Sequence, residues 1–377
     1  MSYQAVPVAN KILRSLRYLR RTTVCLAILP LTSGPLLAQA RIYVANQDDA
    51  TISIIDAKTH RLLETLDLRR YGFGDNAKPH HAQVEPDGKV WYVTLIGAGK
   101  VLKLDRSNKL LGSADLEVPG LMTLQPGGDL MFIGRSMSAV NPPPRMAIVR
   151  RSDMRLLDEI DLLFPRPHGI VTHPAGKRVY VASLGTNQIA SVGVEEQDVE
   201  LIEVPGSAHG FVQAAISPDG RWLAVTAELT DQLKIFDLMD RRKPRLTRTI
   251  PLPDGPFEPI FTGDGRWIFV TCLSANRLAV VDAGNWKVAA VLEHPAFAQP
   301  HGVALSPDGQ HLFVSNRHQL GGAHQHQGGK PTGTGTVVAF CAATRKPEHV
   351  LTVGNYAAGM GSPLPLGKAV PAPRPCR

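Results

Sequence analysis

The feature that most restricts the fold of this 377-residue chain is a turn that returns about every 44 residues. The turn reads EPDG, QPGG, HPAG, SPDG, TGDG and SPDG, beginning at residues 85, 125, 173, 217, 262 and 306. Short runs rich in Val and Ile stand on either side of each turn, as in a β-hairpin. A spacing of this size, maintained six times, indicates a repeat architecture.

Each repeat contains four candidate strands. The second strand follows the turn, as in WYVT at 91–94 and IFVT at 268–271, and a third ends near an acidic residue such as Asp105 or Asp282. A fourth, more variable strand leads into the next repeat. One unit of this size cannot bury its own apolar faces, so the units must pack against one another.

A seventh unit is split between the two ends of the chain. The segment from Arg41 onward supplies its second, third and fourth strands, and a candidate first strand lies near Ala358 to Gly367. A ring closed in this way leaves no exposed sheet edge. We therefore predict an all-β fold, a seven-bladed β-propeller of four-stranded blades over 41–367. Because proline is a poor strand former, eight blades or an open ring are the alternatives. Residues 368–377 are expected to form a disordered tail.

Residues 1–40 have the pattern of a signal peptide. They hold five basic residues and no acidic one, then an apolar run interrupted by Pro30 and Gly34, then Ala38-Gln39-Ala40. An uncleaved membrane anchor is the alternative, although the run is shorter than the roughly 20 residues of a span. We expect cleavage near Ala40, a periplasmic or secreted protein, and no membrane span afterwards. Arg20-Arg21 leaves Sec and twin-arginine export both open.

Charge and cysteine content narrow the choice of partners. The formal charge of +8 comes mostly from the first 40 residues, and without them 36 basic residues face 33 acidic ones. This balance gives no reason to expect a nucleic-acid partner, and we expect a monomer.

The cysteines restrict the kinds of site that are possible. No C-x-x-C spacing occurs, which excludes a zinc ribbon or c-type haem attachment. An oxidising compartment allows one disulfide, for which Cys341 and Cys376 are a candidate pair.

The second strands also carry a family resemblance. YVAN (43–46), WYVT (91–94), VYVA (179–182), IFVT (268–271) and FVSN (313–316) resemble the YVTN-repeat β-propellers, over residues 41 to about 354. The resemblance is specific for the fold and weak for activity. It implies a periplasmic binding protein, a surface-layer protein or a redox-enzyme subunit. Related propellers include lactonases, haem d1 domains and copper-binding proteins, and fold alone does not choose among them.

Histidines gather on one predicted face. The Pro-Asp-Gly turns lie on one side of the ring, here the turn face. The starts of the first strands and the loops between second and third strands lie on the other, here the mouth face. His80, His168 and His301 each stand five positions before the first residue of their turn, on the innermost strand. Eight of the 13 histidines map to the mouth face: His80, His81, His168, His209, His301, His318, His324 and His326.

Imidazole groups in this number suggest a metal or cofactor site. Imidazole binds copper, zinc, iron and nickel, so copper, another first-row metal and haem are the candidate cofactors, and the sequence does not identify one. The candidate metal ligands are His80, His81, His168, His301, His318, His324 and His326. The alternative is that Pro-His-Gly is turn chemistry, with each imidazole bonded to a neighbouring carbonyl. The His-Gln-His loop also fits a low-affinity metal-scavenging segment.

Three functions compete on these observations. The sequence favours a non-catalytic binding or scaffold protein that holds a small molecule or protein at the channel mouth, with His209, Glu258, Arg317 and Arg135 as ligand contacts. The second is a metal- or haem-binding redox propeller using His80, His168 and His301. The third is a lactonase-like hydrolase, which needs His, Arg and Glu or a cation at the mouth. No G-x-S-x-G, Walker or H-E-x-x-H motif occurs, and no catalytic residue is assigned.

Overall fold

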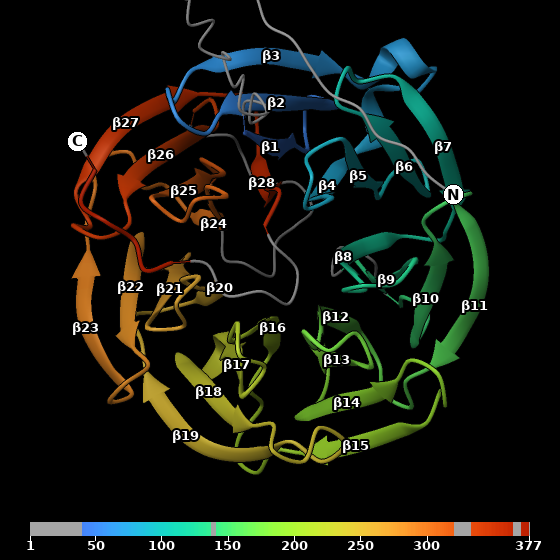
Figure 1. The fold of residues 1–377 in the computed structure, drawn as a ribbon, viewed down its shortest axis with the longest axis vertical. Coiled ribbons are helices and arrows are strands. Elements are labelled where there is room, and N and C mark those ends of the chain that lie inside the picture. Colours follow the sequence, from blue (N-terminus) through green and yellow to red (C-terminus); the bar gives the residue numbers. More distant parts are fainter. Residues whose placement is uncertain (1–39, 137–140, 320–332, 365–370, 377) are drawn as a thin grey trace, which may run out of the picture. The chain divides into compact units, whose positions relative to one another are not determined.

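A computed structural model describes residues 40–136, 141–319, 333–364 and 371–376. Within them the chain forms seven four-stranded antiparallel sheets around a central axis (Figure 1). This confirms the predicted seven-bladed β-propeller. The expected signal segment, apart from Ala40, lies outside the described residues, as do His324 and His326. The described part contains no helix that is long and apolar enough to cross a membrane.

Each blade runs from the axis outward in four steps. The innermost strands are β4 (Pro79–Val84), β8 (Pro119–Leu124), β12 (Pro167–Thr172), β16 (Phe211–Ile216), β20 (Pro256–Phe261), β24 (Pro300–Leu305) and β28 (Ala357–Gly361). The second strands are β1 (Arg41–Asn46), β5 (Val90–Leu95), β9 (Leu130–Arg135), β13 (Arg178–Ser183), β17 (Trp222–Ala227), β21 (Trp267–Cys272) and β25 (His311–Asn316).

The outer half of each blade is more exposed. The third strands are β2 (Thr51–Asp56), β6 (Lys100–Asp105), β10 (Arg145–Arg150), β14 (Gln188–Gly193), β18 (Gln232–Asp237), β22 (Arg277–Asp282) and β26 (Thr336–Cys341). The fourth strands are β3 (Leu62–Asp67), β7 (Leu110–Asp115), β11 (Arg155–Asp161), β15 (Val199–Glu203), β19 (Arg245–Pro251), β23 (Lys287–Leu292) and β27 (Pro347–Thr352). In the part of the chain that the structure describes, three short 3₁₀ helices complete the elements: η1 (Leu68–Tyr71), η2 (Asp75–Ala77) and η3 (Glu228–Thr230).

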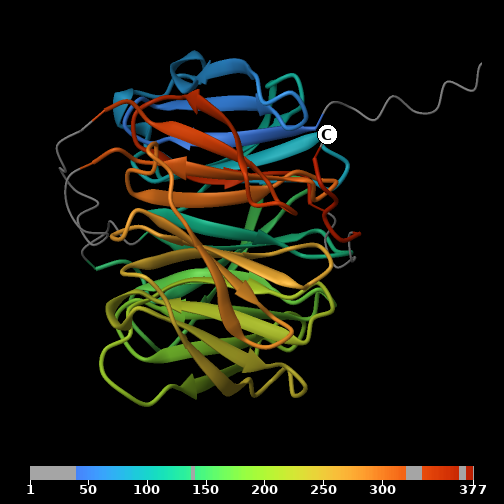
Figure 2. The ribbon, with the colours of Figure 1, turned by 90° about the vertical axis from the view of Figure 1, so that its left-hand side faces the viewer.

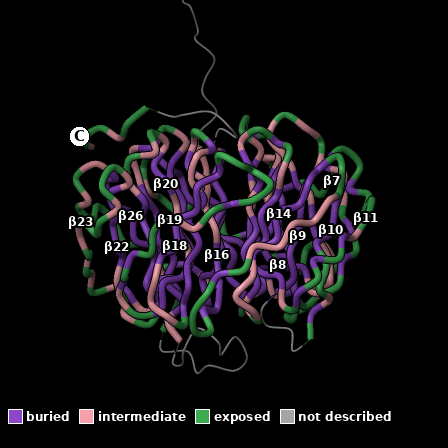
Figure 3. Tube along the Cα trace, turned by 90° about the horizontal axis from the view of Figure 1, so that it is seen from below, coloured by how far each residue is buried: buried purple, intermediate pink, exposed green. Residues whose placement is uncertain are grey.

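Burial follows this order. The second and third strands are almost wholly buried, whereas the fourth strands are mostly exposed (Figure 3). Strands buried on both faces read as continuous apolar runs, which is why Val, Ile and Phe fill the second strands. The side view shows the strands of successive blades stacked beside one another (Figure 2).

The repeated turn needs its glycine. In the turn after β24, Ser306 Oγ donates to Asp308 Oδ1 at 2.6 Å, and Asp308 accepts the Gln310 N–H at 3.1 Å. Gly309 then has φ of 69°, a conformation that side chains with a Cβ rarely adopt. The Pro-Asp-Gly sequence is therefore explained by the hairpin geometry alone.

Hydroxyl groups on the second strands join neighbouring blades. Thr271 Oγ1 donates to the His301 carbonyl of the next blade at 2.9 Å, and Thr226 Oγ1 donates in the same way to the Phe257 carbonyl at 2.6 Å. Ser315 Oγ reaches the Ala358 carbonyl at 2.6 Å. All three hydroxyl-bearing residues are completely buried. The Thr or Ser of the repeat thus fixes the inner strand of the following blade.

Both termini close the ring. β28 pairs antiparallel with β1, with Met360 opposite Val44, so the predicted closing strand is confirmed. The prolines of the same segment come after β28, where no ladder donor is needed. Residues 371–376, expected in the disordered tail, are instead tied back, because Cys376 forms a disulfide with Cys341. The candidate cysteine pair is therefore confirmed.

Candidate functional site

Bulges in the inner strands direct side chains toward the axis. In β4 the register shifts between Pro79 and Ala82, and β20 and β24 shift at the same place. A bulge interrupts the regular alternation of side chains and re-aims them. As a result His80 and His81 both lie at the channel, although they are neighbours in sequence.

Three histidines converge near the mouth end of the channel. The ring centroids of His80 and His168 are 6.5 Å apart, and those of His80 and His301 are 6.3 Å apart. Gly120 and Ala358 occupy the same register on the strands between them, and their small size leaves room for the imidazoles. The convergence agrees with the sequence register. The side chains are buried, however, where the sequence reasoning expected them around an open mouth.

Burial favours the neutral form of His80 and His168. Burial lowers the pKa of His80 well below its usual value and lowers the pKa of His168 to about 4. His168 Nδ1 lies 2.6 Å from the Val212 carbonyl, and His80 Nδ1 lies 3.2 Å from Gln47 Oε1. Donation through Nδ1 leaves Nε2 as an acceptor, and within the described chain neither Nε2 has a hydrogen-bond partner.

Two other groups of candidate metal ligands occur in the described residues. In the described residues, the groups of three or more candidate ligands with donor atoms within 4.8 Å are His60–His311–Glu348 and Cys341–Glu348–Cys376. The layer of His80, His168 and His301 is not among them. Metal binding there stays a prediction. His318, another candidate ligand, lies with Nε2 3.1 Å from Thr336 Oγ1.

A charged layer lies next to the histidines on the mouth side. Its members directly follow second strands, Arg317 after β25 and Glu228 after β17. Arg317 donates from Nη1 to Tyr356 Oη at 2.8 Å and from Nη2 to Gln299 Oε1 at 3.1 Å. Both Arg317 and Glu228 are buried, at 2% and 6% exposure.

Glu228 has the pKa of a general base. Burial raises the pKa of its carboxyl to about 7, and the positive charge of Arg317 partly opposes this rise. A carboxyl of this pKa changes protonation near neutral pH, which suits proton transfer. The sequence reasoning missed Glu228. Counting residues within each blade could have found it, because Glu228 and Arg317 hold the same position after their second strands.

At the other end the channel widens into a cavity of about 280 Å³. It reaches the turns at Pro126 and Pro218, so it lies toward the turn face. Of the predicted site residues, His81 and Glu258 line it. Burial raises the pKa of Glu258 to about 8 and lowers that of His81 to about 4. The Met122 N–H points to His81 Nδ1 at 3.3 Å.

The position of this cavity differs from the expected mouth-face site. Its walls include the small residues Thr123, Ala215, Ala304 and Gly361, which leave space on the axis. At the mouth end, buried imidazole, guanidinium and aromatic groups surround the axis. The repeat register predicted the position of these residues along their strands. It could not show how closely their side chains pack around the axis.

Two predicted ligand contacts are engaged within the protein. His209 is buried, with Nδ1 3.1 Å from Thr230 Oγ1 and Nε2 3.1 Å from the Pro205 carbonyl. Arg135 is buried as well, donating to the Glu117 carbonyl at 2.8 Å and pairing with Glu159. Their binding role stays a prediction, whereas their structural contacts are plain.

Burial of the histidine layer gives a stability prediction. Exposed mouth histidines would tolerate alanine with little loss, but His168 is 1% exposed and bonded to Val212. We therefore expect His168→Ala to lower the free energy of unfolding by about 2–3 kcal/mol, through a cavity and an unpaired carbonyl. Urea denaturation measures this change. A loss below about 0.5 kcal/mol, the range of surface substitutions, would contradict the buried position.

Comparison with known proteins adds the family context. A family model described as "Lactonase, 7-bladed beta-propeller" matches residues 163–317. The chain is 23% identical over 186 residues to Antigen Lp49 of Leptospira interrogans, covering 44% of this chain and 38% of the relative. It is 23% identical over 235 residues to a probable 6-phosphogluconolactonase of Arthroderma benhamiae, covering 53% and 59%. The chain therefore spans less than two thirds of both curated relatives.

A solved structure extends the likeness over the whole ring. The periplasmic gluconolactonase PpgL of Pseudomonas aeruginosa superposes with a TM-score of 0.66 at 17% identity, covering 85% of this chain and 98% of that one. Identity at this level supports the fold alone. The family model describes lactonases, so the narrower resemblance to YVTN-repeat propellers is not confirmed. The descriptions favour the lactonase-like hydrolase over the binding or scaffold protein that the sequence reasoning preferred.

Proposed function

We propose that this protein is a lactonase-like hydrolase that opens a small cyclic ester at the mouth end of its propeller channel. The observation that carries the proposal is the placement of Glu228 and Arg317. Both are buried at the same level of the channel, and the Glu228 carboxyl has a pKa of about 7. A general base of neutral pKa near a fixed cation is the pair that ester hydrolysis needs.

Each residue has a role in the proposed reaction. Ionised Glu228 takes a proton from water, and the resulting hydroxide attacks the lactone carbonyl carbon. Arg317 stabilises the negative charge that develops on the carbonyl oxygen. The tetrahedral intermediate then breaks its bond to the ring oxygen, which receives the proton held by Glu228. The product is the open-chain hydroxy acid.

The histidine layer suits substrate orientation. The unpartnered Nε2 atoms of His80 and His168 are acceptors for hydroxyl groups. Since both imidazoles are neutral, they add no positive charge that would compete with Arg317. A polyhydroxylated lactone is therefore the substrate class that we propose. The lactonase descriptions of the family model and of the relatives support the same choice.

The wider setting of the reaction belongs to the same proposal. The basic and apolar residues 1–40 are the reason to place the protein in the periplasm or outside the cell. The disulfide between Cys341 and Cys376 suits an oxidising compartment. The mature protein would then meet its substrate outside the cytoplasm.

Hydrolysis of lactones by the mature protein tests the proposal. We expect D-gluconolactone or 6-phosphogluconolactone to open faster with the protein than in matched buffer, followed by acid release. The rate should rise with pH through about 7, since Glu228 must lose its proton to act as a base. If neither these lactones nor other sugar lactones open faster than in buffer, the proposal fails.

A further inference from the structure

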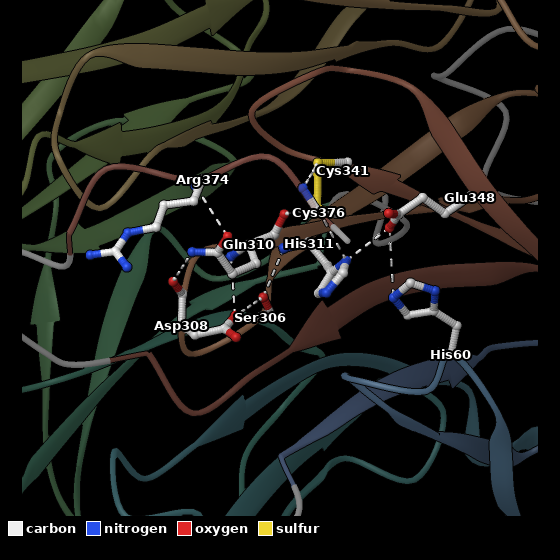
Figure 4. The surroundings of a disulfide bond; sticks show 9 residues. All are labelled: His60, Ser306, Asp308, Gln310, His311, Cys341, Glu348, Arg374 and Cys376. Atoms are coloured by element: carbon white, nitrogen blue, oxygen red, sulfur yellow. Dashed lines mark hydrogen bonds and ion pairs between the residues drawn. A yellow bond between two sulfur atoms is a disulfide. The ribbon is translucent and has the colours of Figure 1, made fainter.

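A second cluster of candidate ligands lies away from the channel, where the blade closed by the termini meets its neighbour. His60 stands in the turn between β2 and β3, Glu348 on the outermost strand β27, and His311 at the start of β25 (Figure 4). The cluster thus joins two blades near the turn face. None of the three residues takes part in the proposed hydrolysis.

The three side chains point toward one another. His311 Nδ1 lies 2.8 Å from Glu348 Oε2, and His60 Nε2 lies 3.9 Å from the same oxygen. One donor atom from each of the three residues lies within 4.8 Å of the donor atoms of the other two. Tetrahedral zinc with bonds of about 2.0–2.2 Å has donor atoms about 3.3 Å apart, a value between the two measured separations. Small rotations of these side chains bring all three donors to one ion.

His60 directs an unbonded ring nitrogen toward Glu348. Its side chain is 11% exposed, and Nε2 has no hydrogen-bond partner within the described chain. The His60 and His311 rings meet edge to face, with centroids 4.6 Å apart. Buried imidazole nitrogens usually have a partner. A cation would supply one to His60 Nε2 and would replace the hydrogen bond between His311 Nδ1 and Glu348.

We propose that His60, His311 and Glu348 bind a divalent first-row transition cation, such as zinc. Two imidazoles and one carboxylate form a donor set that such cations accept, with the fourth position left to water. The site is partly accessible, because Glu348 keeps 25% of its side chain exposed. The ion would link β27 of one blade to the β2–β3 turn of the next.

The disulfide keeps the cysteines out of this ligand set. Cys376 Sγ lies 3.9 Å from His311 Nδ1, and both sulfur atoms lie within 4.8 Å of the Glu348 donor. While Cys341 and Cys376 are bonded to each other, neither is a thiolate that could bind the ion. The oxidised protein therefore tests the His–His–Glu set alone.

Zinc titration of oxidised protein tests the site. The background chain carries no histidine tag, and alanine replaces His318, His324 and His326 so that the mouth-face loop cannot bind the ion. Calorimetry should show one zinc ion per background chain. His60→Ala and Glu348→Gln should each weaken binding by at least about tenfold. His349→Ala, which removes an exposed neighbouring histidine on β27, should bind zinc like the background.

Two further readouts keep the outcome decisive. Glutamine has nearly the same size as glutamate, so Glu348→Gln should fold. A melting temperature measured without metal checks that it does. Zinc should raise the melting temperature of the background and not that of Glu348→Gln. If the background binds no zinc, or if both ligand variants bind it unchanged, the cluster is only a hydrogen-bonded contact between blades and the proposal is wrong.

Discussion

Replacing Glu228 with glutamine is expected to lower kcat for lactone opening by about 10²–10⁴-fold, the usual contribution of a general base. Glutamine has nearly the same size and stays buried, but it cannot take a proton from water. Burial holds the pKa of Glu228 near 7, so the rise of activity through neutral pH should disappear together with the rate. Steady-state kinetics across the pH range measure both effects.

A matched variant separates this chemistry from a general loss of charge. Glu293→Gln removes an exposed carboxylate that pairs with Arg277 at 2.9 Å, directly after the outermost strand β23. We expect this variant to keep the wild-type rate and pH profile. An unchanged kcat in Glu228→Gln, or a change in KM alone, would exclude Glu228 as the base while leaving other channel residues to be tested.

Removing the disulfide is expected to give the largest loss of stability. Cys341 and Cys376 are 35 positions apart, and a closed loop of that length contributes about 4 kcal/mol in the chain-entropy description. Cys376→Ser opens this loop at its C-terminal end and leaves the buried Cys341 in place. Urea denaturation of the oxidised proteins should show the difference in the free energy of unfolding.

The tail offers its own control for this experiment. Arg374→Ala changes a residue two positions away, whose backbone N–H donates to Gln310 Oε1 at 3.1 Å. Since the alanine variant keeps both the backbone donor and the disulfide, its stability should match the wild type. A loss below about 1 kcal/mol in Cys376→Ser would mean that the disulfide does not restrain the unfolded chain as expected.

The fold followed from the sequence because its signal is local and repeated. The turn residues around Asp308 and Gly309 need only their own hairpin to explain them, and the same pattern recurs in other blades. The closing strand was harder to predict, since its prolines argue against a strand. It was found because β1 lacked an inner neighbour, and β28 provides that neighbour.

The candidate site was less predictable, because its properties arise from packing between distant strands. The repeat register predicted that His80, His168 and His301 lie at one level of the channel. The tautomer of His80 depends on its contact with Gln47, and that of His168 on the Val212 carbonyl, and the sequence pattern shows neither contact. The pKa of Glu228 depends on how closely the blades surround its carboxyl, and the spacing of residues in the sequence does not reveal this. The resemblance to YVTN propellers rested on second-strand tetrapeptides such as WYVT at 91–94 and is not confirmed, whereas a family model that describes lactonases matches residues 163–317.

The pairing of β1 with β28 has a consequence for how the molecule is made. The hydrogen bond from the Asn355 N–H to Asp49 joins residues 306 positions apart, so the first strand waits for the last to be synthesised. Contacts this distant in sequence slow folding. Until β28 arrives, β1 presents an unpaired edge that can accept a strand from another molecule. Newly made chains therefore risk exchanging their last strands and forming domain-swapped oligomers during the interval before each ring closes.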